Sequence, residues 1–93
     1  MNCSLLDDAQ LVSLLNEEAA FSEIYRRYRS VLYEAAKYKV DSSALAEEIV
    51  QDIFADLWER RNTVEIIHLR SYLYGALRFQ VFNHIRGKHL RQS

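Results

Sequence analysis

The chain has 93 residues, of which 49% are hydrophobic and 27% charged, and its formal net charge is −1. That length holds one domain with one core, so we expect residues 1–93 to form a single domain. Two glycines and no proline favour helices, because these residues mark most turns and hairpins. The single cysteine excludes an internal disulfide and a thiolate zinc site, and it fits a reducing cytoplasm. No apolar run is long enough to insert in a membrane, and the amino-terminal residues lack the basic start of a secretory signal.

The charges are unevenly distributed along the chain. All 13 acidic residues precede residue 66. From there to the end the charged side chains are all basic: Arg70, Arg78, Arg86, Lys88 and Arg91. Such asymmetry favours two surfaces that bind two kinds of partner.

Hydrophobic periodicity predicts four helices, over about 7–16, 19–39, 43–61 and 69–89. Asp41, Ser42 and Ser43 are residue types that cap the start of a helix. The apolar side of the second helix is predicted to contain Phe21, Ile24, Tyr25, Tyr28, Leu32, Ala35 and Ala36. The buried side of the fourth is predicted to contain Leu73, Leu77, Val81 and Ile85. We expect a loop over 62–68 and a helix end at Gly87. The short connections predict an all-α fold, a compact bundle of four helices.

The third predicted helix has one markedly acidic side, in the sequence AEEIVQDIFADLWERR (46–61). At about 100° per residue, its core side contains Ile49, Ile53, Phe54 and Leu57. Its opposite side carries Glu48, Gln51, Asp52, Ala55 and Glu59. Glu48, Asp52 and Asp56 stand four apart, where like charges repel by roughly a few tenths of a kcal/mol per pair. A solvated face would explain this row. The lack of a basic residue before Arg60, together with Trp58 at the border, favours a docking surface instead.

AEEIVQDIFADLWERR resembles region 2.2 of bacterial sigma factors, specifically those of the extracytoplasmic-function (ECF) type. Two further segments, AAFSEIYRRYRSVLYEAA (19–36) and SYLYGALRFQVFNHIR (71–86), are similar to the preceding and following helices of the same domain. The resemblance covers nearly the whole chain in order, and it implies a sigma region 2-like fold and a role in transcription initiation in the bacterial cytoplasm. Members of this family usually continue into a second domain with a helix-turn-helix, called region 4. We therefore expect this chain to be an isolated region 2 domain from which region 4 is absent.

The resemblance implies that the acidic side docks on the basic β′ clamp coiled coil of the RNA polymerase core. Carried over by position, the implied polymerase-binding residues are Glu48, Gln51, Asp52, Ala55 and Trp58. Acids that face a basic helix steer association and fix its register more than they add affinity. An anti-sigma factor is a further expected partner, because such inhibitors typically cover the same faces.

The fourth predicted helix carries a second row of side chains, namely Tyr72, Ala76, Phe79, Asn83 and Arg86, flanked by Arg78 and Phe82. Two interpretations are open for this row. Aromatic residues at helical spacing often pack in a core. Together with basic residues they also suit nucleic acid, because cations neutralise phosphates and aromatic rings stack on unpaired bases.

The resemblance implies that this helix and the loop before it bind the minus-ten promoter element and capture a flipped base of the non-template strand. The residues implied around the base are Asn62, His68, Arg70 and Ser71. Those implied along the strand are Tyr74, Arg78, Asn83, Arg86 and Lys88. The family's common Arg-Asn pair is Arg78-Phe79 in this chain, so Asn83 becomes the candidate for that polar contact.

No catalytic set is apparent in the sequence. Glu65 and His68 form only one half of a di-metal motif. His84 and His89 are poorly spaced for metal ligands on one helix, and Cys3 lies in an end expected to be disordered, without an obvious base. The sequence therefore predicts no enzyme activity, no metal and no cofactor. The alternative function is a helical protein–protein interaction module that does not bind DNA.

Overall fold

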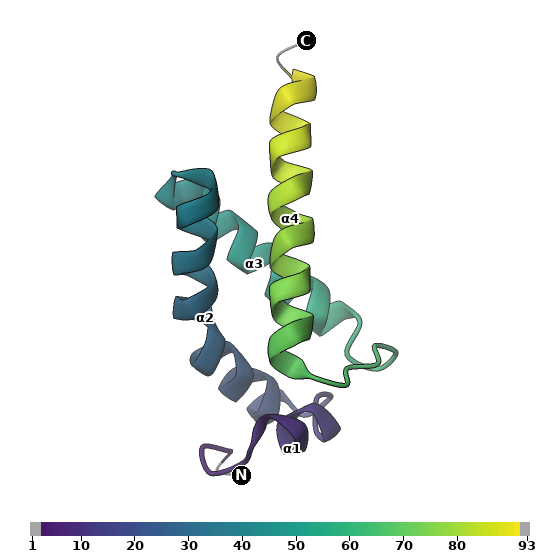
Figure 1. Ribbon diagram of the computed structural model, residues 1–93. Helices are drawn as coiled ribbons and strands as arrows, with labels where there is room; N and C mark the ends of the chain where they lie inside the picture. The colour runs from purple at the N-terminus through teal and green to yellow at the C-terminus, as the bar shows by residue number, and fades with distance from the viewer. Residues whose placement is uncertain (1–2, 92–93) are drawn as a thin grey trace.

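The computed structural model describes residues 3–91, with side chains described as far as residue 87. Its helices are α1 (Asp8–Ser13), α2 (Glu18–Val40), α3 (Ser43–Glu59) and α4 (Leu69–Arg91), and the described residues contain no strand. Figure 1 shows α2 and α4 standing side by side, with α3 crossing behind α4 and α1 closing the base near the amino terminus. The predicted all-α bundle of four helices is confirmed.

Capping side chains explain where the helices begin. Asp7 accepts a hydrogen bond from the backbone N–H of Gln10 at 2.8 Å, and the Gln10 side chain accepts one from the backbone N–H of Asp7 at 2.9 Å. This reciprocal pair satisfies N–H groups that the first turn of α1 leaves free. Ser42 caps α3 by accepting from the backbone N–H of Leu45. Between α2 and α3, Asp41 adopts φ 50°, the left-handed conformation that ends a helix and allows an immediate change of direction.

The helix ends differ from the prediction mainly at three carboxyl ends, including that of α3, which stops at Glu59 and not at residue 61. Helix α1 ends at Ser13, earlier than predicted, and α4 continues through Gly87 as far as Arg91. A glycine ends a helix when it adopts a positive φ, and neither Gly75 nor Gly87 does so. Gly87 therefore lies inside the helix. The predicted loop over 62–68 is confirmed, and the turns already begin at residue 60.

The core combines side chains from all four helices. Its largest fully buried members are Leu11, Ile24, Leu32, Ile49, Ile53, Leu57, Leu73 and Leu77. Two predicted core residues are wrong, because Tyr25 is 39% exposed and Ile85 is 54% exposed. The last turns of α4 extend beyond the other helices (Figure 1). At the level of Ile85 the contact with α3 is made by His84, which lies on a different side of α4.

A network of charged side chains, which we call the Glu23 network, ties the amino-terminal segment to α2. The buried carboxylate of Glu23 accepts hydrogen bonds from Arg26 and Arg27, each at 2.6 Å. Arg27 also donates to Asp8 at 3.2 Å, and the hydroxyl of Tyr28 donates to Asp8. Hydrogen bonds from Arg26 and then Arg27 lower the pKa of Glu23 to about 2. Burial and the bond to Asp8 raise the pKa of Tyr28 to about 12.

Arg27 also holds the first described residues in place. Its guanidinium donates hydrogen bonds to the backbone carbonyls of Cys3 and Leu6, at 3.3 and 2.5 Å. Cys3 is buried and belongs to the core cluster. The expectation of a disordered end at Cys3 is therefore wrong, because Arg27 supplies partners for carbonyl groups that lie outside any helix.

Candidate functional site

The predicted acidic side of α3 is an exposed surface, and we call Glu48, Gln51, Asp52 and Ala55 the acidic strip. Three of these residues are exposed and Asp52 is half-buried, whereas Ile49 and Ile53 behind them are buried. Among the side chains described to residue 87, no Lys or Arg forms an ion pair with Glu48 or Asp52. Further along α3, Asp56 pairs with Arg60 at 3.3 Å. The negative charge of the strip is therefore compensated by lysine or arginine only beyond its carboxyl end.

Trp58 closes one end of the strip and is half-buried. Its ring packs edge-on against Phe21 of α2, with ring centroids 4.8 Å apart. The guanidinium carbon of Arg61 lies over the same ring, 3.8 Å from the centroid. The indole is thus held in one position by contacts within the chain, and only part of it remains available to a partner.

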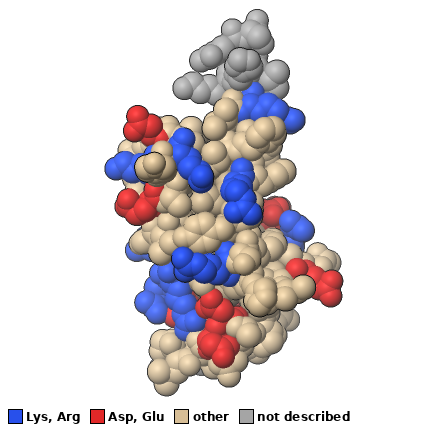
Figure 2. Space-filling model, viewed as in Figure 1, with Lys and Arg blue, Asp and Glu red and all other residues tan. Residues whose placement is uncertain are grey.

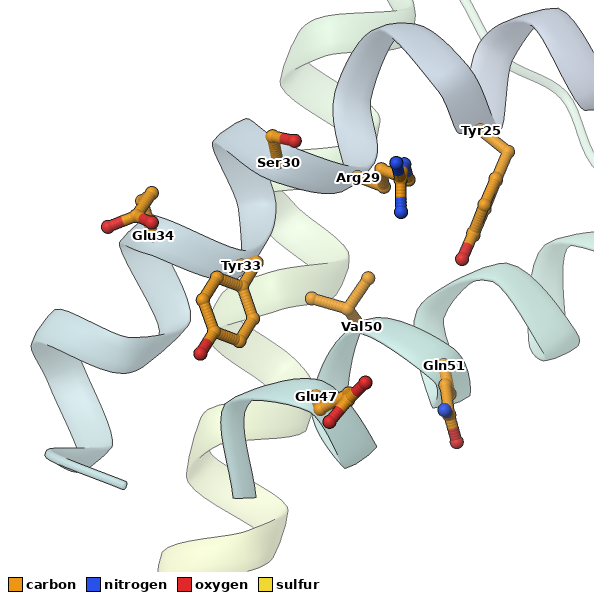
Figure 3. A pocket seen from close by; sticks show the side chains of 8 residues that line it. All are labelled: Tyr25, Arg29, Ser30, Tyr33, Glu34, Glu47, Val50 and Gln51. Carbon is orange, nitrogen blue, oxygen red and sulfur yellow. The ribbon is translucent and has the colours of Figure 1, made fainter. Parts of the chain in front are cut away.

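A groove runs beside the strip, between α2 and α3 (Figure 3). Tyr25, Arg29 and Tyr33 reach into it from α2, and Glu47 and Gln51 line it from α3. Its volume is about 220 Å³. Gln51 belongs to both the strip and the groove, so the two form one continuous surface. The sequence did not predict this groove, because Tyr25 was predicted to be a core residue. The signal that would have revealed it is Arg29, four residues later on the same side of α2, whose guanidinium lies 5.8 Å from the Tyr25 ring centroid.

The strip also touches α4. Nε2 of His84 lies 3.1 Å from Oδ2 of Asp52. Glu48, Asp52 and His84 are the residues of the described chain whose His, Asp, Glu or Cys ligand atoms gather closely enough to hold a metal ion, all within 4.8 Å of one another. Sequence reasoning considered His84 only beside His89, whose side chain lies outside the described part of the structure. It missed this contact because Asp52 stands 32 residues earlier in the chain.

Basic and aromatic side chains alternate along α4. We call them the arginine–aromatic ridge, and its members stand four apart: Arg70, Tyr74, Arg78, Phe82 and Arg86. The guanidinium of Arg70 lies 5.2 Å from the Tyr74 ring centroid, and that of Arg86 lies 5.9 Å from the Phe82 centroid. All three arginines are exposed. In Figure 2, basic side chains follow α4 from its base toward its end. Sixteen residues of helix give the ridge a length of about 24 Å.

The residues predicted around a captured base separate into different places. His68 and Arg70 line a cavity of about 240 Å³ between the loop and α1. Ser71 lines another, of about 460 Å³, between α3 and α4, together with Tyr72 and Phe79. Asn62 is exposed at the far end of the loop and lines neither of these cavities. The structure thus brings together only the pair His68 and Arg70.

The second predicted row on α4 is likewise divided, here between half-buried and exposed positions. Tyr72 is half-buried, and burial raises the pKa of its hydroxyl. Phe79 is 61% exposed, so it does not serve as a core residue. Asn83 is half-buried and Arg86 is exposed. The predicted residue Lys88 has its backbone in α4, and its side chain lies outside the described part of the structure.

The domain is all-α, with an acidic strip on one helix and an arginine–aromatic ridge on the next, so it presents two surfaces of opposite charge. The family model described as Sigma-70 region 2 matches residues 24–91, and the chain belongs to this family. It is therefore a sigma factor domain with a role in transcription initiation, which involves RNA polymerase and promoter DNA, and its family is not one of enzymes. None of the curated proteins and none of the solved structures compared with the chain matches it. Across residues 3–91, no helix combines the length and the hydropathy that crossing a membrane requires.

Proposed function

We propose that this chain is the region 2 domain of an ECF-type sigma factor in the bacterial cytoplasm. Its acidic strip docks on the β′ clamp coiled coil of RNA polymerase, while the loop before α4 and the arginine–aromatic ridge bind the minus-ten element. The observation that carries the proposal is the acidic strip. It is exposed, it lies over buried Ile49 and Ile53, and it has no lysine or arginine partner within the described chain.

Electrostatics favour a basic helical partner for the strip. Glu48 and Asp52 repel each other across one turn of α3, and a cation between them would turn that repulsion into attraction. The groove beside them is lined by the carboxylates of Glu34 and Glu47 and by one cation, Arg29, so it adds net negative charge to this surface. Ala55 leaves space for the backbone of an approaching helix, and Trp58 supplies a rigid edge.

The ridge on α4 has the composition that single-stranded DNA requires. Arginines neutralise phosphates, and the ring of Phe82 can stack on a base whatever its identity. The cavity beside His68 and Arg70 supplies a place for one unpaired base, with a cation at its edge. We propose that the base enters there, and that Tyr74, Arg78, Asn83, Arg86 and Lys88 follow the strand.

A charge reversal tests the docking surface. Glu48→Lys with Asp52→Lys is expected to weaken binding of the chain to bacterial RNA polymerase core by at least about a hundredfold, because like charges facing each other at an interface cost several kcal/mol. Binding is measured by fluorescence anisotropy of the labelled chain, and circular dichroism checks that helicity is retained.

The matched control is Glu17→Lys with Glu65→Lys, which makes the same change in net charge at two exposed positions away from the strip. This variant is expected to bind within about threefold of the unmodified chain, because distant exposed charges are screened. Equal weakening of both variants, or unchanged binding of the strip variant, contradicts the proposed docking surface.

A second experiment tests the DNA surface. Arg78→Ala and Arg86→Ala are each expected to weaken binding to a single-stranded oligonucleotide and to reduce the slope of log K against log salt by about 0.7. Lys37→Ala, an exposed position on α2, removes one positive charge away from the ridge and is expected to leave that slope unchanged. If the slope is the same in all of these chains, the phosphate contacts assigned to the ridge are wrong.

An anti-sigma factor is the second partner that we propose, on one specific observation. The carboxyl-terminal half of α4, from its middle onward, exposes three large apolar side chains, Phe79, Phe82 and Ile85. A helical inhibitor that covered them would bury apolar area and block the DNA surface together. Loss of inhibitor binding on Phe82→Ser with Ile85→Ser, without loss of polymerase binding, would support this partner.

A further inference from the structure

The contact between the strip and α4 has the composition of a metal site. Two carboxylates come from α3, on one side of the helix because they stand four residues apart, and an imidazole comes from α4. The side chain of His84 is 18% exposed, whereas that of Asp52 is 46% exposed. The ring is therefore held by its surroundings, while the carboxylates remain accessible to an ion in solution.

The distances suit a small divalent cation. Zinc bonds to nitrogen and oxygen ligands at about 2.0–2.2 Å, so two ligand atoms on one tetrahedral ion stand about 3.3–3.6 Å apart. The nitrogen of His84 and the oxygen of Asp52 are 3.1 Å apart because they form a hydrogen bond, and the whole group lies within 4.8 Å. An ion would replace that hydrogen bond, and the two ligand atoms would move slightly apart to bind it. Glu48 is exposed, and its carboxylate oxygen already belongs to this group of ligand atoms.

The donor atoms also restrict the kind of ion. Magnesium and calcium prefer oxygen ligands throughout, whereas an imidazole nitrogen favours zinc and its first-row neighbours. The nitrogen donor comes from a different helix, 32 residues from Asp52, so the group is more than an acidic patch on one surface. Its position follows from the packing of α3 against α4.

We propose that Glu48, Asp52 and His84 bind one divalent transition-metal ion, with Zn²⁺ as the representative. Three protein ligands leave the fourth position of a tetrahedral ion to water. The bound ion joins α3 to α4, and it therefore stabilises the folded chain in proportion to the logarithm of its concentration.

The ion would also occupy two residues of the acidic strip. Metal and a basic helix then compete for Glu48 and Asp52, so Zn²⁺ is expected to inhibit docking on polymerase. This consequence rests on the proposed function, whereas the binding of the metal does not.

The direct test is titration of the purified chain with ZnCl₂ by isothermal calorimetry, with thermal unfolding measured in parallel. We expect one saturable site and a rise in unfolding temperature that Mg²⁺ at the same concentration does not produce. His84→Gln, Asp52→Asn and Glu48→Gln are each expected to weaken the site at least about tenfold, since even partners beyond the metal ligands are worth 10–100-fold in affinity. Each variant is compared with its own metal-free form, so that a general loss of stability is not counted as loss of binding.

Two controls locate the ion. Glu47→Gln changes the neighbouring acid, which faces the groove, and His68→Gln changes a histidine outside the cluster. Both are expected to bind Zn²⁺ as the unmodified chain does. Absence of saturable binding to the unmodified chain, or full binding by His84→Gln, overturns the proposal.

The competition is tested with His84→Gln, which keeps both carboxylates of the strip. Zn²⁺ is expected to weaken polymerase binding of the unmodified chain and to have at least about tenfold less effect on His84→Gln. Equal inhibition of both chains overturns the competition at this site. A chain that binds Zn²⁺ as expected and does not bind polymerase at any metal concentration contradicts the proposed function and supports the metal site alone.

Discussion

Glu23 and Glu48 are both glutamates on long helices, and the structure uses them in opposite ways. Glu23 is 8% exposed and accepts hydrogen bonds from two arginines. Glu48 is exposed, and its near neighbours at the strip are an acid and a histidine. The carboxylate of Glu23 is paired with two cations of the same chain, Arg26 and Arg27. That of Glu48 has no lysine or arginine partner among the described side chains, and we propose that its cation comes from outside the chain.

The difference shows how to separate a structural charge from one that serves binding. A buried carboxylate must be paired, because an unpaired charge away from water is very costly. An exposed carboxylate carries no such requirement, so neighbouring acids on a surface that lack a lysine or arginine partner add only a small repulsion. Variants that remove one carboxylate or its partner should therefore change stability strongly in the Glu23 network and weakly at the strip.

The largest effect on stability is expected from Glu23→Gln, which keeps the size of the side chain and removes its charge. The pKa of Glu23 is lowered from 4.5 to about 2, so its contribution to stability is fully present above pH 4.5 and is lost as the pH falls toward 2. Urea unfolding at a series of pH values should show a large gap between the variant and the unmodified chain at pH 7, which narrows between pH 4.5 and 2. Glu34→Gln, at an exposed position on the same helix, should show little gap at any pH. A gap for Glu23→Gln that persists unchanged at pH 2 would contradict this account of the network.

A smaller effect is expected from Tyr28→Phe, which removes the hydroxyl that donates to Asp8. The cost is about 1 kcal/mol in the free energy of unfolding, the usual net value of one such hydrogen bond. The pKa of Tyr28 is raised from 10.0 to about 12, so this contribution is complete below pH 10 and is lost as the pH rises through 12. The control is Tyr38→Phe, since Tyr38 is 91% exposed. Equal losses of stability for Tyr28→Phe and Tyr38→Phe would show that the hydrogen bond between Tyr28 and Asp8 is not the cause.

The smallest effect, and one of opposite sign, is expected from Glu48→Gln. Removing one of two like charges that stand four apart should stabilise the chain by about 0.2–0.5 kcal/mol in the absence of any metal. Glu47→Gln makes the same change in net charge, and residue 51 four positions later is a glutamine, so no gain is expected there. Chemical unfolding of the two variants side by side gives the difference directly. A loss of stability for Glu48→Gln would mean that this carboxylate is structural, as Glu23 is.

Much of the fold and part of the site could be predicted from the sequence. The periodicity of α3 correctly assigned Ile49, Ile53, Phe54 and Leu57 to the core and Glu48 to the surface, because both faces of a helix follow from spacing along the chain. Ser42 is the kind of residue that caps a helix wherever it stands, and it does so here. The base-binding residues could not be grouped in this way, since the loop that carries His68 has no period that fixes the direction of its side chains.

What the sequence by itself determined about this protein is therefore the set of helices, the acidic side of one and the basic character of another. These depend on residues within a few turns of one another. Tertiary structure alone decided that Ile85 and Tyr25 are exposed, that Arg27 secures the chain near Cys3, and that His84 reaches Asp52. The physical reason is the same in each case. Burial and contact depend on where a neighbouring helix begins, crosses and ends, and no local pattern carries that information.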